Sequence, residues 1–162
     1  MTPEQAKLEL RKAVRKALGL RKNGKVDITS RDQGGGAYYS VKVPSVQSVF
    51  NMLHFKLYYF PGCCKYGILS EVSATGTFRG KKLSYPLIDV AVAIARKEGY
   101  SKIIATTAKE ENSVMEHVLE RAGWKRVDKG KNANSGNVVT MWIKETGKTR
   151  GKDVFMSCDS GA

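Results

Sequence analysis

The sequence predicts an α/β or α+β fold, in which helices pack on a β-sheet. After residue 64 the chain alternates strand-like and helix-like apolar patterns, an order typical of helices layered on a sheet. Its 162 residues, of which 41% are apolar, suffice for one domain with a closed core. We therefore expect a domain over 26–144, preceded by a basic helix and linker over 1–25 and followed by a polar, basic tail over 145–162.

Charge is distributed unevenly along the chain. Lys and Arg exceed Asp and Glu by 13, and residues 1–26 and 125–152 each hold eight basic and two acidic residues. The middle of the chain is close to neutral. Such a surplus favours polyanionic partners, such as nucleic acid, anionic membrane or phosphorylated ligands, over a neutral metabolic role. No stretch is apolar enough to span a membrane, and the cysteine content fits a reducing compartment.

The N-terminal segment predicts a basic amphipathic helix over 2–18. Thr2 as N-cap, Pro3 in the first turn and Gln5 three residues after the cap form a helix-start signature. Apolar residues at helical spacing then make one stripe, and Gly19 ends the helix. The rest of its surface is basic and carries Lys7, Arg11, Lys12, Arg15 and Lys16.

The remaining elements are predicted from apolar spacing and from the positions of glycine and proline. Two of the strands are expected to form a hairpin at Pro61-Gly62. In chain order we expect a strand over 26–29, a flexible glycine break at 34–36, a short helix over 44–53, strands over 55–60 and 65–74, a helix over 86–98, a strand over 102–106, a helix over 112–122, a loop over 129–137 and a strand over 138–143.

The connection from Ala74 to Ser84 carries the strongest chemical signal. A strand runs through a basic, glycine-containing turn into a helix, an arrangement in which backbone N–H groups can hold an anion. The alternative is an ordinary strand-to-helix turn with solvated lysines.

From Leu69 to Val127 the sequence resembles the GNAT superfamily of acyl-CoA-dependent N-acetyltransferases. That family has a turn of the form Arg/Gln-x-x-Gly-x-Gly/Ala at a helix N-terminus. A strand, an Asn and a helix ending in Gly and an aromatic residue follow further along. Here Arg79-Gly80 stands at the turn, Asn112 opens the second helix and Gly123-Trp124 ends it.

The resemblance implies a mixed, bent sheet whose two parallel strands splay apart, with the pantetheine of acetyl-CoA in the gap. The strand edge at Val72 and Ala74 would hydrogen-bond the pantetheine amides, and the backbone of 79–84 would hold the pyrophosphate. The implied cofactor-binding residues are Val72, Ala74, Arg79, Gly80, Lys81, Lys82, Leu83, Ser84 and Asn112.

Two departures from the family pattern bear on activity. Lys82 and Ser84 replace glycines that let the backbone approach the pyrophosphate, although the Lys82 ammonium could contact a phosphate itself. Pro86 places the helix start near Ser84, which becomes a candidate N-cap. Leu119 stands where many family members carry the tyrosine that protonates the departing thiolate. The replacement acid would be Tyr85, His117 or Cys64, or else water.

A base is also needed to deprotonate the incoming amine. Glu71 is the candidate, since enzymes of this family often use a carboxylate in this strand. Alternatively, Glu71 is a strand carboxylate paired with one of the many lysines. Cys63-Cys64, without matching His or Cys spacing, does not predict a metal site.

Two functions remain open. The first is transfer of an acetyl group from acetyl-CoA to an unidentified amine. The second is a catalytically degenerate GNAT-like structural protein, for example a bacteriophage virion component, that associates with nucleic acid or an acidic protein through its basic ends. The residues for that association would be the cations of 2–18 and of the tail over 145–162. The expected location is the cytoplasm or, if the protein is viral, the virion.

Overall fold

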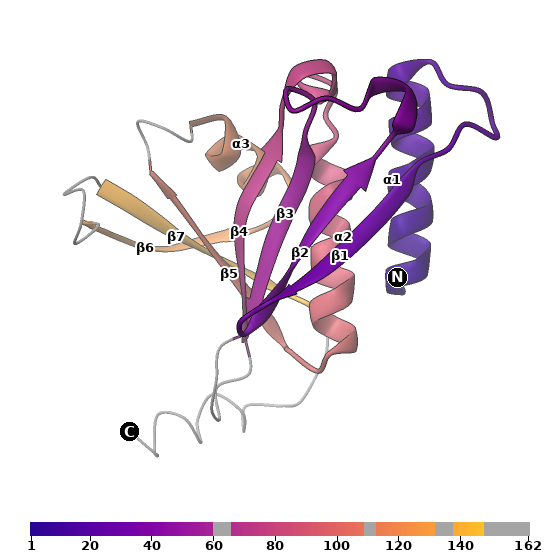
Figure 1. The fold of residues 1–162 in the computed structure, drawn as a ribbon. Helices are drawn as coiled ribbons and strands as arrows, with labels where there is room; N and C mark the ends of the chain where they lie inside the picture. Colours follow the sequence, from indigo (N-terminus) through magenta and orange to yellow (C-terminus); the bar gives the residue numbers. More distant parts are fainter. Residues whose placement is uncertain (60–65, 109–112, 132–137, 148–162) are drawn as a thin grey trace.

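The structure is a computed structural model that describes residues 1–59, 66–108, 113–131 and 138–147 (Figure 1). The helices are α1 (Pro3–Leu18), α2 (Ser84–Lys97) and α3 (Ser113–Arg121). The strands are β1 (Asp27–Gln33), β2 (Gly36–Lys42), β3 (Leu53–Tyr59), β4 (Tyr66–Ala74), β5 (Lys102–Ala108), β6 (Lys125–Lys131) and β7 (Val138–Glu145). Helices layered on a sheet confirm the predicted fold class.

The seven strands form one sheet in the order β1-β2-β3-β4-β5-β7-β6. β4 and β5 are parallel, and every other neighbouring pair is antiparallel. α2 lies in the connection between the two parallel strands, because a parallel pair needs a crossover. The sheet is bent, and β5, β7 and β6 turn away from β1 to β4 (Figure 1). The mixed, bent sheet expected from the family resemblance is therefore present.

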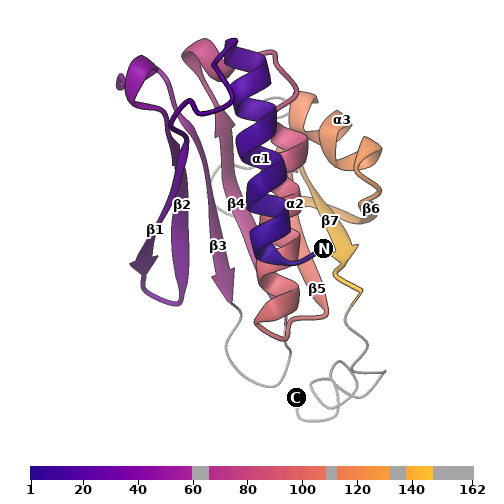
Figure 2. The ribbon, with the colours of Figure 1, turned by 90° about the vertical axis from the view of Figure 1, so that its right-hand side faces the viewer.

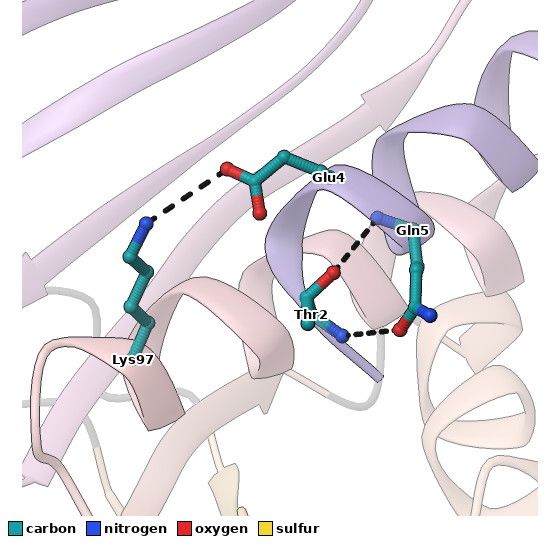
Figure 3. Close-up of polar contacts among 4 residues, drawn as sticks. All are labelled: Thr2, Glu4, Gln5 and Lys97. Atoms are coloured by element: carbon teal, nitrogen blue, oxygen red, sulfur yellow. Dashed lines mark hydrogen bonds and ion pairs between the residues drawn. The ribbon is translucent and has the colours of Figure 1, made fainter.

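The start of α1 follows the predicted capping pattern. The Thr2 hydroxyl accepts a hydrogen bond from the Gln5 backbone N–H at 3.1 Å, and the Thr2 N–H donates to the Gln5 side chain at 2.8 Å (Figure 3). Gly19 ends the helix in the left-handed conformation. Near its start, Glu4 lies 3.8 Å from Lys97 at the end of α2. α1 and α2 therefore run antiparallel.

α1 and α2 lie side by side on one face of the strands β1 to β4 (Figure 2). α1 buries Ala6, Leu10 and Val14 in the same apolar core that takes the inner face of α2 and the inward side chains of the sheet. α3 packs on β5 and β6 and adds Val118 and Leu119 to that core. No helix among the described residues is long and apolar enough to cross a membrane.

The glycine break expected at 34–36 is instead the turn of a hairpin that joins β1 to β2. β2 was not predicted, because its two adjacent tyrosines face opposite sides of the sheet and hide the alternation of polar and apolar residues. Gly36 is required here, since a Cβ at this position would overlap the backbone of Leu57 and Tyr58 in β3.

The short helix expected over 44–53 is wrong. Only Pro44–Val46 forms a 3-10 turn, and β3 already begins at Leu53. The apolar residues occur at helical spacing but do not share a buried face, because Val49 and Phe50 are exposed. Spacing alone could not show that this segment is a loop.

The loop expected over 129–137 is also wrong in its first part, because β6 extends to Lys131 and pairs with β7. β6 is an edge strand, where lysines and glycine are common because one side of the strand stays unpaired. The other predicted helices and strands are present, with ends shifted by up to a few residues. The expected turn at Pro61-Gly62, the loop residues 132–137 and the tail from residue 148 lie outside the described residues.

Candidate functional site

The central feature of the site is the place where β4 and β5 part. The two parallel strands pair only from Tyr66 to Leu69 with Lys102 to Ala105. Over the described residues beyond that point, β4 pairs only with β3, and β5 pairs only with β7. Figure 1 shows the two strands diverging from their paired ends. The facing edges of 70–74 and 106–108 are therefore available to a ligand that can supply backbone-like hydrogen bonds.

A β-bulge in β4 coincides with this parting. His54 pairs with Ser73 and Lys56 pairs with Ser70, so Glu71 and Val72 together oppose the single residue Phe55. Glu71 has a φ of 51°, in the left-handed region that non-glycine residues rarely adopt. A bulge of this kind bends its strand and breaks its pairing. It explains why β4 leaves β5 here, and the sequence carries no local signal for it.

Val72 and Ala74 lie on the part of β4 that has left β5, and both are half-buried against the core. The turn that follows leads straight into α2. Its residues Arg79 to Lys82 are exposed, whereas Leu83 is buried at 2% exposure and fixes the entry to the helix. These positions together line one route from the strand edge to the start of α2.

The start of α2 is not capped by Ser84, contrary to the sequence expectation. Ser84 is the first helical residue, and Leu83 occupies the cap position without a side-chain hydrogen bond. The burial of Leu83 in the core sets this boundary. The N–H groups of Ser84 and Tyr85 have no partner within the helix, and the first turn contains no acidic residue. An anion at this end would meet N–H donors and three neighbouring cations.

Lys82, where the family pattern has a glycine, lies in the left-handed region, with a φ of 58°. We expect Lys82→Gly to raise the free energy of unfolding by about 1 kcal/mol, because the left-handed conformation penalises a Cβ. Urea unfolding would measure the change. Lys81→Gly is the matched control, since Lys81 is not among the residues with positive φ; an equal gain in both variants would contradict this explanation.

A second loop holds the beginning of the turn. The Thr75 hydroxyl donates to the Phe50 carbonyl and accepts from the Met52 N–H, both at 2.9 Å. The Asn51 side chain accepts from the Thr77 N–H at 2.9 Å and donates to the Val46 carbonyl at 2.7 Å. The sequence did not point to Asn51 and Thr75, because the hydrogen bonds of each reach a segment that is distant in the sequence.

The candidate base, Glu71, is bound to a lysine. Its carboxylate lies 2.8 Å from the Lys56 ammonium, and its side chain remains 56% exposed. The hydrogen bond that the Lys56 ammonium donates to the Glu71 carboxylate raises the pKa of Lys56. The pair links β4 to β3, the strand that neighbours β4 on the side opposite β5.

His54 lies next to this pair and was not singled out by the sequence. It is 9% exposed, its Nδ1 has no hydrogen-bond partner among the described residues, and its ring centroid lies 5.1 Å from that of Tyr38. Burial lowers the pKa of His54 below its ordinary value of 6.5. His54 is therefore neutral at pH 7, although Glu71 opposes part of the shift.

The lowered pKa of His54 predicts a pH effect on stability. The folded protein binds this proton less tightly than the unfolded chain, so the contribution is complete above pH 6.5 and falls as the pH drops from 6.5 toward the lower folded-state pKa. We expect His54→Gln to lose less stability than the wild type between pH 7 and pH 5, as measured by urea unfolding at each pH. An identical loss in both proteins would show that His54 does not titrate in this way.

The other candidate residues are spread over the fold. Tyr85 is half-buried in the first turn of α2 and packs against the core. His117 is exposed on α3, and Leu119 is buried at 1% exposure, so this position supplies packing and no proton. Cys64 and Asn112 lie outside the described residues.

Comparison with known proteins gives a clear result for the fold. No family model matches the sequence, and no curated protein sequence matches it. Among solved structures, a GNAT-family acetyltransferase from Elizabethkingia anophelis with acetyl-CoA bound is similar, with a TM-score of 0.61, 12% identity, and coverage of 76% of this chain and 99% of that one.

Two further solved structures are similar to this chain in fold. A protein from Desulfovibrio desulfuricans assigned to the GNAT acetyltransferases has a TM-score of 0.59 at 16% identity, over 70% of each chain. A mutant form of the spermidine/spermine N-acetyltransferase of Vibrio cholerae has a TM-score of 0.56 at 14% identity, over 69% of this chain and 68% of that one. At such identities the similarity establishes a GNAT-like fold.

Proposed function

We propose, from a fold shared with GNAT acetyltransferases, that this protein binds an acyl-CoA between β4 and β5 and transfers the acyl group to an amine. One observation carries the proposal: β4 leaves β5 after the Leu69–Ala105 pair and runs directly toward the uncapped start of α2. An extended ligand with amide groups at one end and a diphosphate at the other matches both features.

The residues present fit such a ligand. The pantetheine arm carries two amides, which can bond to the free edge of residues 70–74 as a neighbouring strand would. The diphosphate can accept hydrogen bonds from the N–H groups of Ser84 and Tyr85. Arg79, Lys81 and Lys82 add positive charge beside them. Proline at position 86 removes one further donor.

The chemistry would be direct transfer. The amine nitrogen attacks the thioester carbonyl, a C–N bond forms, and the C–S bond breaks to release the CoA thiolate. Glu71 would accept the proton lost by the amine, with Lys56 holding its carboxylate in place, and Tyr85 is the candidate donor to the thiolate. Backbone N–H groups at the bulge would stabilise the developing oxyanion.

A second function has support from a different observation. Leu119 occupies the position of the family tyrosine and is buried at 1% exposure, so the fold supplies no proton donor there. A protein that kept the fold and lost catalysis, such as a structural component, would tolerate this residue. It would bind acetyl-CoA weakly or not at all, and it would transfer nothing.

Calorimetric titration with acetyl-CoA separates the two functions. Wild type should bind acetyl-CoA, and Arg79→Gln combined with Lys81→Gln should weaken binding, because each charge-assisted contact to phosphate contributes about 1.5–3 kcal/mol. Arg96→Gln combined with Lys97→Gln removes the same charge at the far end of α2 and should change nothing. Absence of binding in the wild type would sink the enzymatic proposal. Binding without loss of acetyl-CoA across a panel of primary amines, including spermidine and peptide N-termini, would favour the structural role.

A further inference from the structure

Several chain segments meet at one end of the molecule. Asp27 pairs with Lys42 and Leu53 pairs with Ala74, so β1 and β3 begin where β2 and β4 end. α2 starts there after β4. α1 ends there too, because it runs antiparallel to α2 and contacts the turn that follows β4. We call this surface the basic end (upper edge of Figure 1), and it consists of residues 19–25, 42–52 and 75–84.

The basic end contains seven Lys and Arg residues and no Asp or Glu. Lys25 lies 3.7 Å from Asp27 at its border. The other six cations form no ion pair within the part of the chain that the structure describes, and all six are exposed. They are Arg21, Lys22, Lys42, Arg79, Lys81 and Lys82.

Two of the cations of α1 have partners within the fold. Lys12 lies 3.4 Å from Glu9, and the Arg15 guanidinium donates to the Gly24 carbonyl at 2.8 Å. Arg15 thereby holds the segment that presents Arg21 and Lys22. Arg21 and Lys22 follow the end of α1, in a surface whose three segments contain no acidic side chain.

Three large apolar side chains are exposed at the basic end, and the least exposed of them is Met52, at 38%. Val49 and Phe50 are 80% and 77% exposed. Their loop is held by the hydrogen bonds of Thr75 and Asn51, and the Phe50 N–H also donates to the Ser48 hydroxyl at 3.2 Å. An aromatic ring is thus kept in water by an ordered loop, which is characteristic of a contact surface.

The same loop closes one side of a cavity of about 420 Å³. Aromatic and apolar side chains form much of its wall, and a few polar groups interrupt them. Such a lining suits a flat, partly polar ring. The residues that line it include Tyr38, Ser40, Lys42, Val49, Met52 and Phe78.

We propose that the basic end binds single-stranded nucleic acid. The six cations contact phosphates, Phe50 stacks on one base, and the cavity receives a neighbouring base. Positive charge combined with an exposed aromatic ring is the arrangement that binds unpaired strands, since every base offers a face for stacking. An anionic bilayer fits less well, because only three exposed large apolar side chains, Val49, Phe50 and Met52, would enter it.

Nucleic-acid binding at the basic end can be tested separately from acyl transfer. It shares Arg79, Lys81 and Lys82 with the proposed diphosphate site, whereas Arg21, Lys22 and Phe50 belong to the nucleic-acid surface alone. Variants of these three residues should leave acetyl-CoA binding unchanged. A failure of acetyl-CoA binding would therefore not count against nucleic-acid binding, and the reverse also holds.

Fluorescence anisotropy with the full-length protein and a labelled DNA strand of about 16 nucleotides tests the proposal. Phe50→Ala should weaken binding by about 5-fold to 100-fold, the range expected for one stacked base. Arg21→Gln combined with Lys22→Gln should weaken binding of the strand. The same variant should reduce the magnitude of the negative slope of log affinity against log salt by about 1.4. Arg96→Gln combined with Lys97→Gln is the charge-matched control and should bind like the wild type.

The following outcomes would overturn the proposal. Wild-type protein that does not bind the strand, or binding that survives both the Phe50 and the Arg21/Lys22 changes, would place no nucleic acid at this surface. Equal binding of an abasic strand would remove the role of Phe50 and the cavity. Binding to phosphatidylserine vesicles but not to the strand would identify the surface as a membrane contact. Circular dichroism would establish that the variants are folded.

Discussion

Glu71→Gln is expected to lower the rate constant of acyl transfer by about 10²-fold to 10⁴-fold, the usual contribution of a general base. Glutamine preserves the size and hydrogen-bonding capacity of the side chain but cannot accept the proton of the amine. The ion pair with Lys56 is partly exposed and is screened by water, so the variant should fold. The measurement is release of free thiol from acetyl-CoA in the presence of the best amine of the panel.

Lys56→Met is the matched control for this experiment. It removes the ion pair and keeps the carboxylate, so transfer should persist at a rate much closer to that of the wild type. The two variants separate a base from a merely structural partner of Lys56. Unchanged transfer in Glu71→Gln would exclude Glu71 as the base, and an equal loss in both variants would assign the effect to the ion pair.

Gly76→Ala is expected to lower the free energy of unfolding by about 2–3 kcal/mol, a large loss for a surface turn. Gly76 has a φ of 59°, which a Cβ disfavours. The added Cβ would also overlap the Asn51 side-chain oxygen and the Phe50 carbonyl, so the loop that holds the turn must move. Urea unfolding measures the loss, and calorimetry should show weaker binding of acetyl-CoA because the turn positions the diphosphate site.

Gly80→Ala provides the comparison. Gly80 has a φ of 72° in the same turn, but a Cβ there would meet nothing within 4 Å. Gly80→Ala should therefore lower the free energy of unfolding only by the penalty for a Cβ at positive φ, about 1 kcal/mol. Equal losses in the two variants would show that the contact between the turn and Asn51 is unimportant for stability.

The parts of the fold that were predictable from sequence have local causes. The capping box of α1 involves Thr2 and Gln5, three residues apart, and the apolar stripe of α2 lies within a few helical turns. The parallel connection through α2 follows from the order of strand and helix patterns. The GNAT-like fold was accessible for the same reason, because Arg79-Gly80 precedes the start of α2 and Gly123-Trp124 follows the end of α3.

The remaining features depend on residues far apart in the chain. β2 is a strand because Gly36 lets it approach β3, and the segment after it is a loop because Asn51 and Thr75 bind each other's neighbours across the fold. The bulge at Glu71 arises from a register shift between two strands. None of these contacts has a period or a motif, so apolar spacing predicted a helix over 44–53 where the structure has a loop.

Since β4 and β5 share only four residue pairs, the sheet consists of two antiparallel blocks joined by a narrow seam. Parallel pairing is slightly weaker per residue than antiparallel pairing, and α2 is the main further link between the blocks. The blocks also share one apolar core, so the seam, the core and α2 together hold them in place. A long ligand lying between β4 and β5 would act as the missing strand and would contact both blocks. Its binding would therefore stabilise the association of the two halves of the protein.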